Sequence, residues 1–208
     1  MNGYFATRFT PDERRAPVWG HLVRYLARWI PADAGVLELG AGYCDFSNAV
    51  AARRRVALDL EPSVVEHAAP GVEARVGDCR ELPFADASFD VVFASNLLEH
   101  LDRPGLAATL AETRRVLRPG GRVVLVQPNF RLRPREYFDD YTHVSVFTDR
   151  SLPDLLAAHG FVVDHVEARF LPLTMKSRLS AGHRLVPWYL RLPWRPLAGQ
   201  MLLVAHRD

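Results

Sequence analysis

Two glycines one residue apart, Gly40 and Gly42, lie between a short apolar run at residues 36–39 and a second one at residues 46–51. Glycine permits positive φ in a tight turn and lets a ligand approach the backbone closely. The second run predicts a helix, whose first N–H groups have no partner within the helix and can donate to a ligand. A strand, a glycine turn and a helix start in this order predict a site for a nucleotide-type ligand.

An acidic residue follows at a position that suits the sugar of such a ligand. Asp59 lies near the end of the apolar run at residues 56–60. At the end of the second strand, a carboxylate can accept hydrogen bonds from both hydroxyls of a ribose. The alternatives for Asp59 are a helix N-cap and a solvated loop acid. The dinucleotide fingerprint G-x-G-x-x-G requires a third glycine where this chain has Asp45, which disfavours NAD as the ligand.

Composition indicates one soluble domain. The chain has 208 residues, of which 49% are hydrophobic and 24% are charged, as in ordinary globular proteins. Its formal net charge of +2 excludes a general polyanion binder. Cys44 and Cys79 are not spaced like a disulfide pair, so we expect a reduced, cytoplasmic protein. We expect no signal peptide and no membrane-spanning segment.

Apolar periodicity predicts helices and strands in alternation up to residue 127. The predicted helices cover residues 11–30, 45–54, 62–67 and 104–117, and the predicted strands cover residues 35–39, 56–60, 72–76, 90–94 and 122–127. This alternation indicates right-handed βαβ units and a parallel sheet.

The remainder of the chain has a different pattern. Residues 129–150 are predicted to form a loop with short helical pieces, followed by a helix over residues 151–159 that is capped by Ser151 and ended by Gly160. Two further strands are predicted, over residues 161–170 and 200–206.

Several motifs resemble those of the class I S-adenosylmethionine (SAM)-dependent methyltransferases. The form E-x-G-x-G, from Glu38 to Gly42, is similar to the first motif of that family. Residues 77–92 are similar to its stretch across strands three and four, and residues 116–121 to the segment before strand five. The similarity is closest to the type 11 group, which includes quinone and sugar methyltransferases. It implies a Rossmann-like α/β fold, with a mostly parallel seven-stranded sheet flanked by helices.

The resemblance also implies SAM as cofactor, S-adenosylhomocysteine as product, and a set of cofactor-binding residues at the strand ends. The methionine part is expected beside Glu38, Gly40, Ala41 and Gly42, the ribose at Asp59 with Leu60 next to it, and the adenine at Asp78 and the backbone of Cys79. Asn96 is expected near the sulfonium, and Arg15 or Trp19 is expected to close over the methionine carboxylate.

The segment after the predicted strand at residues 90–94 bears on the acceptor. Methyltransferases that act on adenine or on protein amides often carry an Asn/Asp-Pro-Pro-aromatic motif there, whereas this chain has residues 95–100, Ser-Asn-Leu-Leu-Glu-His. The difference disfavours that kind of N-methylation. His100 is a candidate base, but the family often has Glu-His here as a structural pair, and we favour the structural interpretation.

A polar loop at residues 135–144 contains our candidate catalytic residues, His143, Asp140 and Tyr141. Methyl transfer to oxygen requires removal of a proton, and histidine suits this task near neutral pH. Asp140 is expected to orient His143. The alternative is a surface loop without a catalytic role. We expect no metal at Asp139 and Asp140, because no further ligand cluster is apparent.

Residues 171–197 contain five basic side chains and no acid, with Trp188, Tyr189 and Trp194 among many leucines. Such a composition can dock on an anionic membrane or on a lipid-linked substrate. The alternative is an extension that packs on the domain or on a second subunit, as in a homodimer. We favour the alternative slightly.

Together these features predict a cytoplasmic enzyme that methylates a small molecule rather than a nucleic acid, with peripheral contact at the inner membrane face as an extension of this prediction. The expected acceptor is the oxygen of a sugar, a lipid-linked compound or a secondary metabolite. The alternatives are a non-catalytic SAM-binding regulator and a protein or nucleic-acid methyltransferase. We expect one domain, with a lid helix at residues 1–32, a SAM-binding core at residues 33–128 and an acceptor side at residues 129–208.

Overall fold

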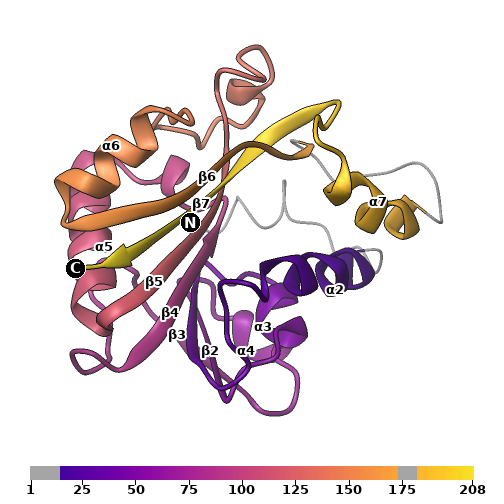
Figure 1. Ribbon diagram of the computed structural model, residues 1–208. Helices are drawn as coiled ribbons and strands as arrows, with labels where there is room; N and C mark the ends of the chain where they lie inside the picture. The colour runs from indigo at the N-terminus through magenta and orange to yellow at the C-terminus, as the bar shows by residue number, and fades with distance from the viewer. Residues whose placement is uncertain (1–14, 173–181) are drawn as a thin grey trace.

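The protein is built on a seven-stranded sheet, and the computed structural model describes residues 15–172 and 182–208 (Figure 1). The strands are β1 (Gly35–Leu39), β2 (Arg54–Asp59), β3 (Val72–Val76), β4 (Phe89–Ser95), β5 (Leu117–Pro128), β6 (Phe161–Pro172) and β7 (Ala198–Arg207). Their order across the sheet is β3-β2-β1-β4-β5-β7-β6. The strands from β3 to β5 in this order are parallel, and β7 runs antiparallel to β5 and β6. The predicted Rossmann-like, mostly parallel sheet is thereby confirmed.

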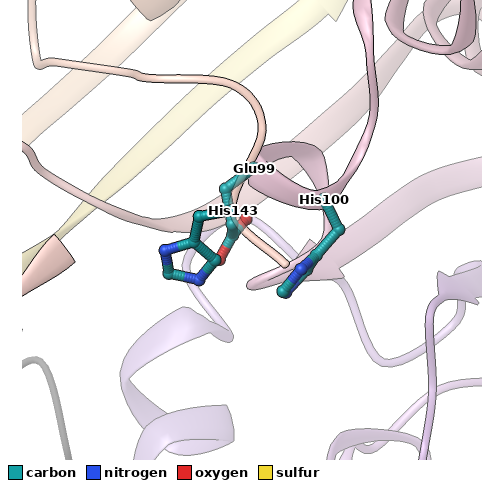
Figure 2. A group of neighbouring side chains, drawn as sticks. All are labelled: Glu99, His100 and His143. Atoms are coloured by element: carbon teal, nitrogen blue, oxygen red, sulfur yellow. The ribbon is translucent and has the colours of Figure 1, made fainter. Parts of the chain in front are cut away.

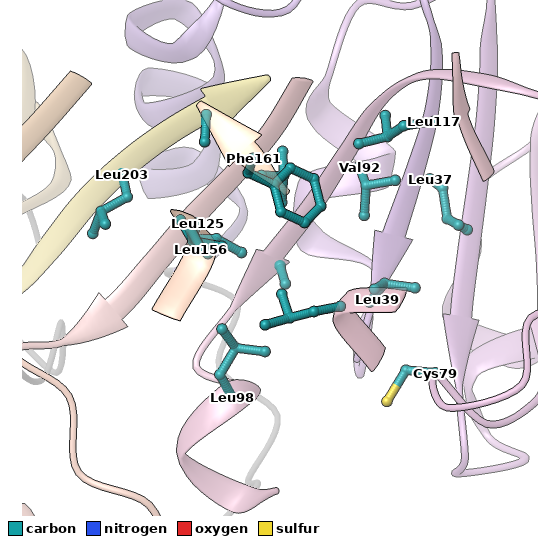
Figure 3. Close-up of a cluster of buried hydrophobic side chains, with 14 of the residues drawn as sticks. Leu37, Leu39, Cys79, Val92, Leu98, Leu117, Leu125, Leu156, Phe161 and Leu203 are labelled. Carbon is teal, nitrogen blue, oxygen red and sulfur yellow. The ribbon is translucent and has the colours of Figure 1, made fainter. Parts of the chain in front are cut away.

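Helices cover both faces of this sheet. They are α2 (Arg15–Leu26), α3 (Asp45–Ala49), α4 (Val64–His67), α5 (Arg103–Val116), α6 (Ser151–Ala158) and α7 (Val186–Arg191), with 3₁₀ turns η1 (Leu98–His100), η2 (Tyr137–Asp139) and η3 (Gly182–Leu185). One apolar cluster, which includes Leu37 and Leu156, joins α5 and α6 to one face (Figure 3). A second cluster, which includes Leu22 and Phe46, joins α2, α3 and α7 to the opposite face. No helix in the described part of the chain is long and apolar enough to cross a membrane.

Strand β1 lies in the middle of these layers and is buried along its whole length. Successive side chains of a strand point to opposite faces. Leu37 and Leu39 therefore pack in the α5 and α6 cluster, whereas Val36 packs in the α2 cluster. The same alternation directs Glu38 toward the α2 and α3 side, so this acid is enclosed by the fold.

Helix α3 is shorter than predicted. It ends at Ala49, because Val50 adopts an extended backbone with ψ 135°, and β2 begins at Arg54. The apolar residues at positions 50 and 51 had extended the helical pattern beyond its real end. The helix predicted over residues 11–30 is observed as α2, which ends four residues earlier, at Leu26; residues 11–14 lie outside the described residues.

Other boundaries also differ from the predictions by a few residues, and the starts of β5 and α6 show why. Strand β5 begins directly after α5, at Leu117, because Leu117 pairs with Phe89 of β4 before the register shifts. Ser151 is the first residue of α6 rather than its cap, and the N-cap residue, Arg150, makes no side-chain cap hydrogen bond. The Thr148 hydroxyl accepts from the N–H of Ser151 at 3.0 Å, and the Ser151 hydroxyl accepts from the N–H of Thr148 at 3.0 Å. This reciprocal pair satisfies two donors at the helix start.

The basic tail packs in part on the domain. Leu190 of α7 is buried in the α2 cluster. Arg195 is 5% exposed, donates to the carbonyl of Leu190 at 2.6 Å and forms an ion pair with Glu167 of β6. Trp188 and Trp194 are 68% and 62% exposed. The described part of the tail thus has one face on the domain and large aromatic side chains in solvent.

Candidate active site

The glycine turn has the backbone that the sequence predicts. Gly40 and Gly42 have φ of +67° and +50°, a region that residues with a side chain rarely adopt. The N–H groups of Gly40 and Ala41 donate to the carbonyl of Leu58 at 2.9 and 3.2 Å, which ties the turn to β2. A Cβ on Gly40 would lie 3.0 Å from the Cδ1 of Leu97, so the position is also sterically closed to larger residues.

Asp59 lies against this turn at the end of β2. Its Oδ2 accepts from the N–H of Gly42 at 2.8 Å, and its Oδ1 accepts from the N–H of Glu61 at 2.8 Å. Each carboxylate oxygen has a second lone pair. Asp59 is therefore held beside the glycines with acceptor capacity left for a ligand, and its role as ribose ligand stays a prediction.

The side chain of Glu38, in the strand before the glycine turn, is bonded to the helix that follows the turn. Its Oε2 accepts from the N–H of Ser47 at 3.0 Å and from the hydroxyl of Ser47 at 2.5 Å. These bonds join β1 to α3. Burial raises the pKa of the Glu38 carboxyl to about 8, although the Ser47 bonds oppose the rise. The placement of Glu38 beside the methionine part of the cofactor stays a prediction.

The other predicted cofactor residues lie along the same edge of the sheet. Parallel pairing sets Leu39 beside Leu58 on one side and beside Ala94 on the other. The residues that follow these strands, Gly40, Asp59 and Asn96, are consequently brought to one edge. Leu60 is 44% exposed there. Asn96 has φ of +50°, and its Oδ1 accepts from Nε2 of Gln200 at 3.0 Å, a contact with β7 that the sequence did not predict.

Asp78 and Cys79 follow β3 but have partners within the protein. The Asp78 carboxylate binds Arg80, with Nη2 at 2.6 Å and Nε at 2.9 and 3.0 Å. Arg80 holds the pKa of Asp78 below its usual range. The thiol of Cys79 lies 3.4 Å from the hydroxyl of Thr109, and burial raises its pKa. Contact of either residue with adenine stays a prediction.

The two residues expected to close over the ligand have different surroundings. Arg15 of α2 forms an ion pair with Asp45, Nε to Oδ2 at 2.6 Å, and so lies at the start of α3 next to the turn. Trp19 is 6% exposed and packs edge-on against Phe46 and Phe93. The expectation that Trp19 closes over the ligand is therefore corrected, because its ring is part of the apolar core.

On the acceptor side, η1 and the loop after β5 meet. The backbone carbonyl of Glu99 accepts from the N–H groups of Val144 and Ser145 at 2.9 and 3.0 Å. This pairing brings the ring of His143 to 5.0 Å from the ring of His100, between centroids. The two loops follow the carboxyl ends of neighbouring parallel strands, where open α/β sheets bind their ligands.

The carboxylate of Asp140 is hydrogen-bonded on the side of His100, and its orientation of His143 stays a prediction. The Nδ1 of His143 donates to the carbonyl of Tyr137 at 2.6 Å, so this carbonyl orients the ring. Asp140 accepts from the hydroxyl of Thr142 at 2.6 Å, and that hydroxyl lies 2.9 Å from Nδ1 of His100. Asp140 thus positions His100 through Thr142. Tyr141 is 71% exposed, and its catalytic role stays a prediction.

The structure adds Glu99, which the sequence analysis had treated only as the neighbour of His100. One carboxylate oxygen of Glu99 and one ring nitrogen from each of His100 and His143 lie within 4.8 Å of one another (Figure 2). Burial raises the pKa of Glu99 to about 8 and lowers that of His100. The adjacency of Glu99 and His100 at a strand end was the available signal, but their approach to His143 is not visible in the sequence.

Comparisons with known proteins found methyltransferases of similar sequence. Residues 37–125 match the family model of the methyltransferase domain. A malonyl-[acyl-carrier protein] O-methyltransferase of Methylococcus capsulatus is 34% identical over 158 residues, which cover 68% of this chain and 56% of the relative. A probable SAM-dependent methyltransferase of Mycolicibacterium smegmatis is 36% identical over 141 residues, which cover 64% of this chain and 54% of the relative. The chain thus spans about half the length of these curated relatives.

Solved structures show the same fold at low identity. A SAM-dependent methyltransferase of Thermotoga maritima, described as a possible histamine N-methyltransferase, superposes with a TM-score of 0.68 at 17% identity. The superposition covers 100% of this chain and 94% of that one. The matched domain and the glycine turn at its first strand support a class I SAM-dependent methyltransferase, a family whose cofactor is SAM.

Proposed function

We propose that this chain transfers the methyl group of SAM to an oxygen atom of a small-molecule acceptor. The observation that carries the proposal is the match of residues 37–125 to the methyltransferase domain, which spans the glycine turn and Asp59. SAM supplies the activated methyl group, and the protein supplies position and exclusion of water. The name of the Methylococcus relative, an O-methyltransferase, supports oxygen as the acceptor atom.

The described residues suit an adenosine ligand. The turn offers backbone without a Cβ at Gly40 and Gly42, and Asp59 presents a fixed carboxylate beside it. Leu60 is the exposed apolar side chain that follows Asp59. We propose that Asp59 binds the ribose hydroxyls, that Leu60 contacts the nucleoside, and that Arg15 stays near the methionine carboxylate.

On the acceptor side, we propose that His143 holds the acceptor or removes its proton. Its Nδ1 carries hydrogen toward the Tyr137 carbonyl, so Nε2 of the neutral ring is the basic atom. His143→Ala is expected to lower turnover about 10²–10⁴-fold if the ring acts on the proton, with SAM affinity retained. His159→Ala is the matched control, because its Nδ1 also lies beside a carbonyl, that of Leu155 at 2.9 Å. Equal turnover of wild type and His143→Ala would remove His143 from the acceptor site.

Calorimetry with SAM, S-adenosylhomocysteine and NAD tests the cofactor, and a screen of hydroxyl and carboxyl acceptors with labelled SAM tests the reaction. We expect the first two ligands to bind and NAD not to bind. Binding of NAD without SAM would contradict the proposal. Binding of SAM with no transfer to any acceptor would favour a regulatory SAM-binding protein, and transfer to protein or nucleic acid would replace the small-molecule acceptor.

A further inference from the structure

We propose that Glu99, His100 and His143 form a binding site for a divalent first-row transition metal ion, such as Zn²⁺ or Fe²⁺. One oxygen or nitrogen atom from each side chain lies within 4.8 Å of the other two (Figure 2). The residues come from η1 and from the loop after β5, so the fold and not the local sequence assembles them.

The strongest observation is the state of Glu99. The side chain is 0% exposed, and neither Oε1 nor Oε2 has a hydrogen-bond partner among the described residues. A buried polar group left without a partner costs about 1–3 kcal/mol, and a charged one costs more. A cation between Glu99 and the two imidazoles would satisfy the carboxylate and explain why an acid stands at this buried position.

Both histidines have a hydrogen-bond partner at Nδ1, as histidines that bind metals usually have at one ring nitrogen. The Nδ1 of His143 faces the Tyr137 carbonyl at 2.6 Å, and a carbonyl can only accept. The hydroxyl of Thr142 donates to Asp140, so it accepts from Nδ1 of His100 at 2.9 Å. Both neutral rings therefore carry their hydrogen on Nδ1 and a lone pair on Nε2. Histidines that bind metals typically hold their other ring nitrogen in such a bond, which fixes tautomer and orientation.

The donor set indicates the class of ion. Two imidazole nitrogens and a carboxylate oxygen suit Zn²⁺ and Fe²⁺ better than Mg²⁺ or Ca²⁺, which prefer oxygen ligands alone. Bonds of about 2.0–2.2 Å place ligand atoms on a tetrahedral ion roughly 3.3 Å apart. The three atoms lie within 4.8 Å of one another, so the side chains must rotate to bring them closer when the ion binds.

Three protein ligands leave at least one coordination position open, as in catalytic rather than structural zinc sites. If the proposed methyl transfer to oxygen holds, the open position suits an oxygen atom of the acceptor. His143 would then be an acceptor-positioning residue that acts through the metal. The metal site itself does not depend on that activity, and its test uses binding alone.

The experiment uses the full chain without an affinity tag, freed of metal by a chelator and then titrated with Co²⁺ as a spectroscopic probe. We expect one equivalent of Co²⁺ to bind, with visible d–d bands that Zn²⁺ abolishes by displacement. Glu99→Gln, His100→Ala and His143→Ala should each abolish or weaken this binding at least tenfold. Thr142→Val, which removes the hydroxyl between His100 and Asp140 and no proposed ligand, should weaken it about 10–100-fold.

His159→Ala is the matched control and should bind Co²⁺ like the wild type. His159 is not one of the three proposed ligands, and its Nδ1 is bonded to the Leu155 carbonyl of its own helix. Circular dichroism of each metal-free variant checks that it is folded. Failure of the wild type to bind one equivalent overturns the proposal without reference to any variant. Unchanged binding in folded Glu99→Gln or His143→Ala overturns it as well. Metal binding without methyl transfer would leave this site standing and count against the proposed function instead.

Discussion

At the scale of single residues, the hydrogen bonds of Asp59 give the most direct prediction on cofactor binding. It already accepts from Gly42 and Glu61, and its remaining lone pairs are those that ribose hydroxyls would use. Asp59→Ala is expected to weaken SAM binding by about 1–3 kcal/mol, the range for losing charged hydrogen bonds. Calorimetry measures the effect, with Asp154→Ala on α6 as control. A SAM affinity that is unchanged in Asp59→Ala would exclude this residue as the ribose ligand.

Glu38 gives a second prediction at this scale, on stability against pH. The folded pKa is about 8, against an ordinary 4.5. Between these values the unfolded chain releases a proton that the folded chain keeps, so the free energy of unfolding falls as pH rises. The contribution is complete below pH 4.5 and is lost as pH rises through about 8. One pKa unit corresponds to about 1.4 kcal/mol.

Urea unfolding at several pH values measures this slope. Glu38→Gln cannot titrate, and its oxygen can still accept from Ser47, so its stability should fall less steeply than that of the wild type over this interval. Glu66→Gln, at an exposed position on α4, is the matched control and should keep the wild-type slope. If the free energy of unfolding changed with pH in the same way in the wild type and in Glu38→Gln, Glu38 would be ionised in the folded protein.

At the scale of elements, Arg195 connects the tail to α7 and β6. Its guanidinium contacts Glu167 and the carbonyls of Leu190 and Arg169, and it is almost fully buried. Breaking a buried ion pair from one side leaves the other charge uncompensated. Arg195→Ala should therefore lower the free energy of unfolding by about 3 kcal/mol.

Denaturant titration measures this loss, and Arg191→Ala provides the control. Arg191 lies over the exposed ring of Trp188 at 5.6 Å, where its removal should cost no more than about 0.5 kcal/mol. If Arg195→Ala were as stable as Arg191→Ala, the tail would not depend on this ion pair.

At the scale of the whole molecule, the exposed tail side chains indicate where a partner could bind. Leu185, Trp188 and Trp194 are more than half exposed, next to basic residues. We propose that residues 171–197 wall the acceptor side, and that they dock on an anionic membrane face; residues 173–181 of this segment lie outside the described residues. A second subunit is the alternative partner.

Sedimentation with anionic vesicles tests the docking. Binding is expected at low salt and should fall as salt rises, because screening shortens the reach of surface charge. The double change Trp188→Ser and Trp194→Ser removes the exposed aromatics and should abolish it. Absence of binding at low salt would rule out docking, and a concentration-dependent dimer that needs the same tryptophans would identify a second subunit as the partner.

Local patterns in the sequence determined the glycine turn, the alternation of strands and helices up to β5, and the acids at the strand ends. Turn chemistry and apolar periodicity act over a few residues, so they can be read directly. They also led to errors at element ends, as at Val50, where a single backbone angle ends the helix, and at Ser151, which begins α6 instead of capping it.

Only the tertiary structure decided which distant groups meet. Strand order brings η1 beside the loop after β5, and the backbone of Glu99 then holds that loop. From this follow the approach of His143 to His100, the role of Asp140 toward Thr142, and the burial of the Glu99 carboxylate. The same order set Trp19 in the core. Contacts of this kind depend on packing between segments far apart in the chain, and no spacing within one segment specifies them.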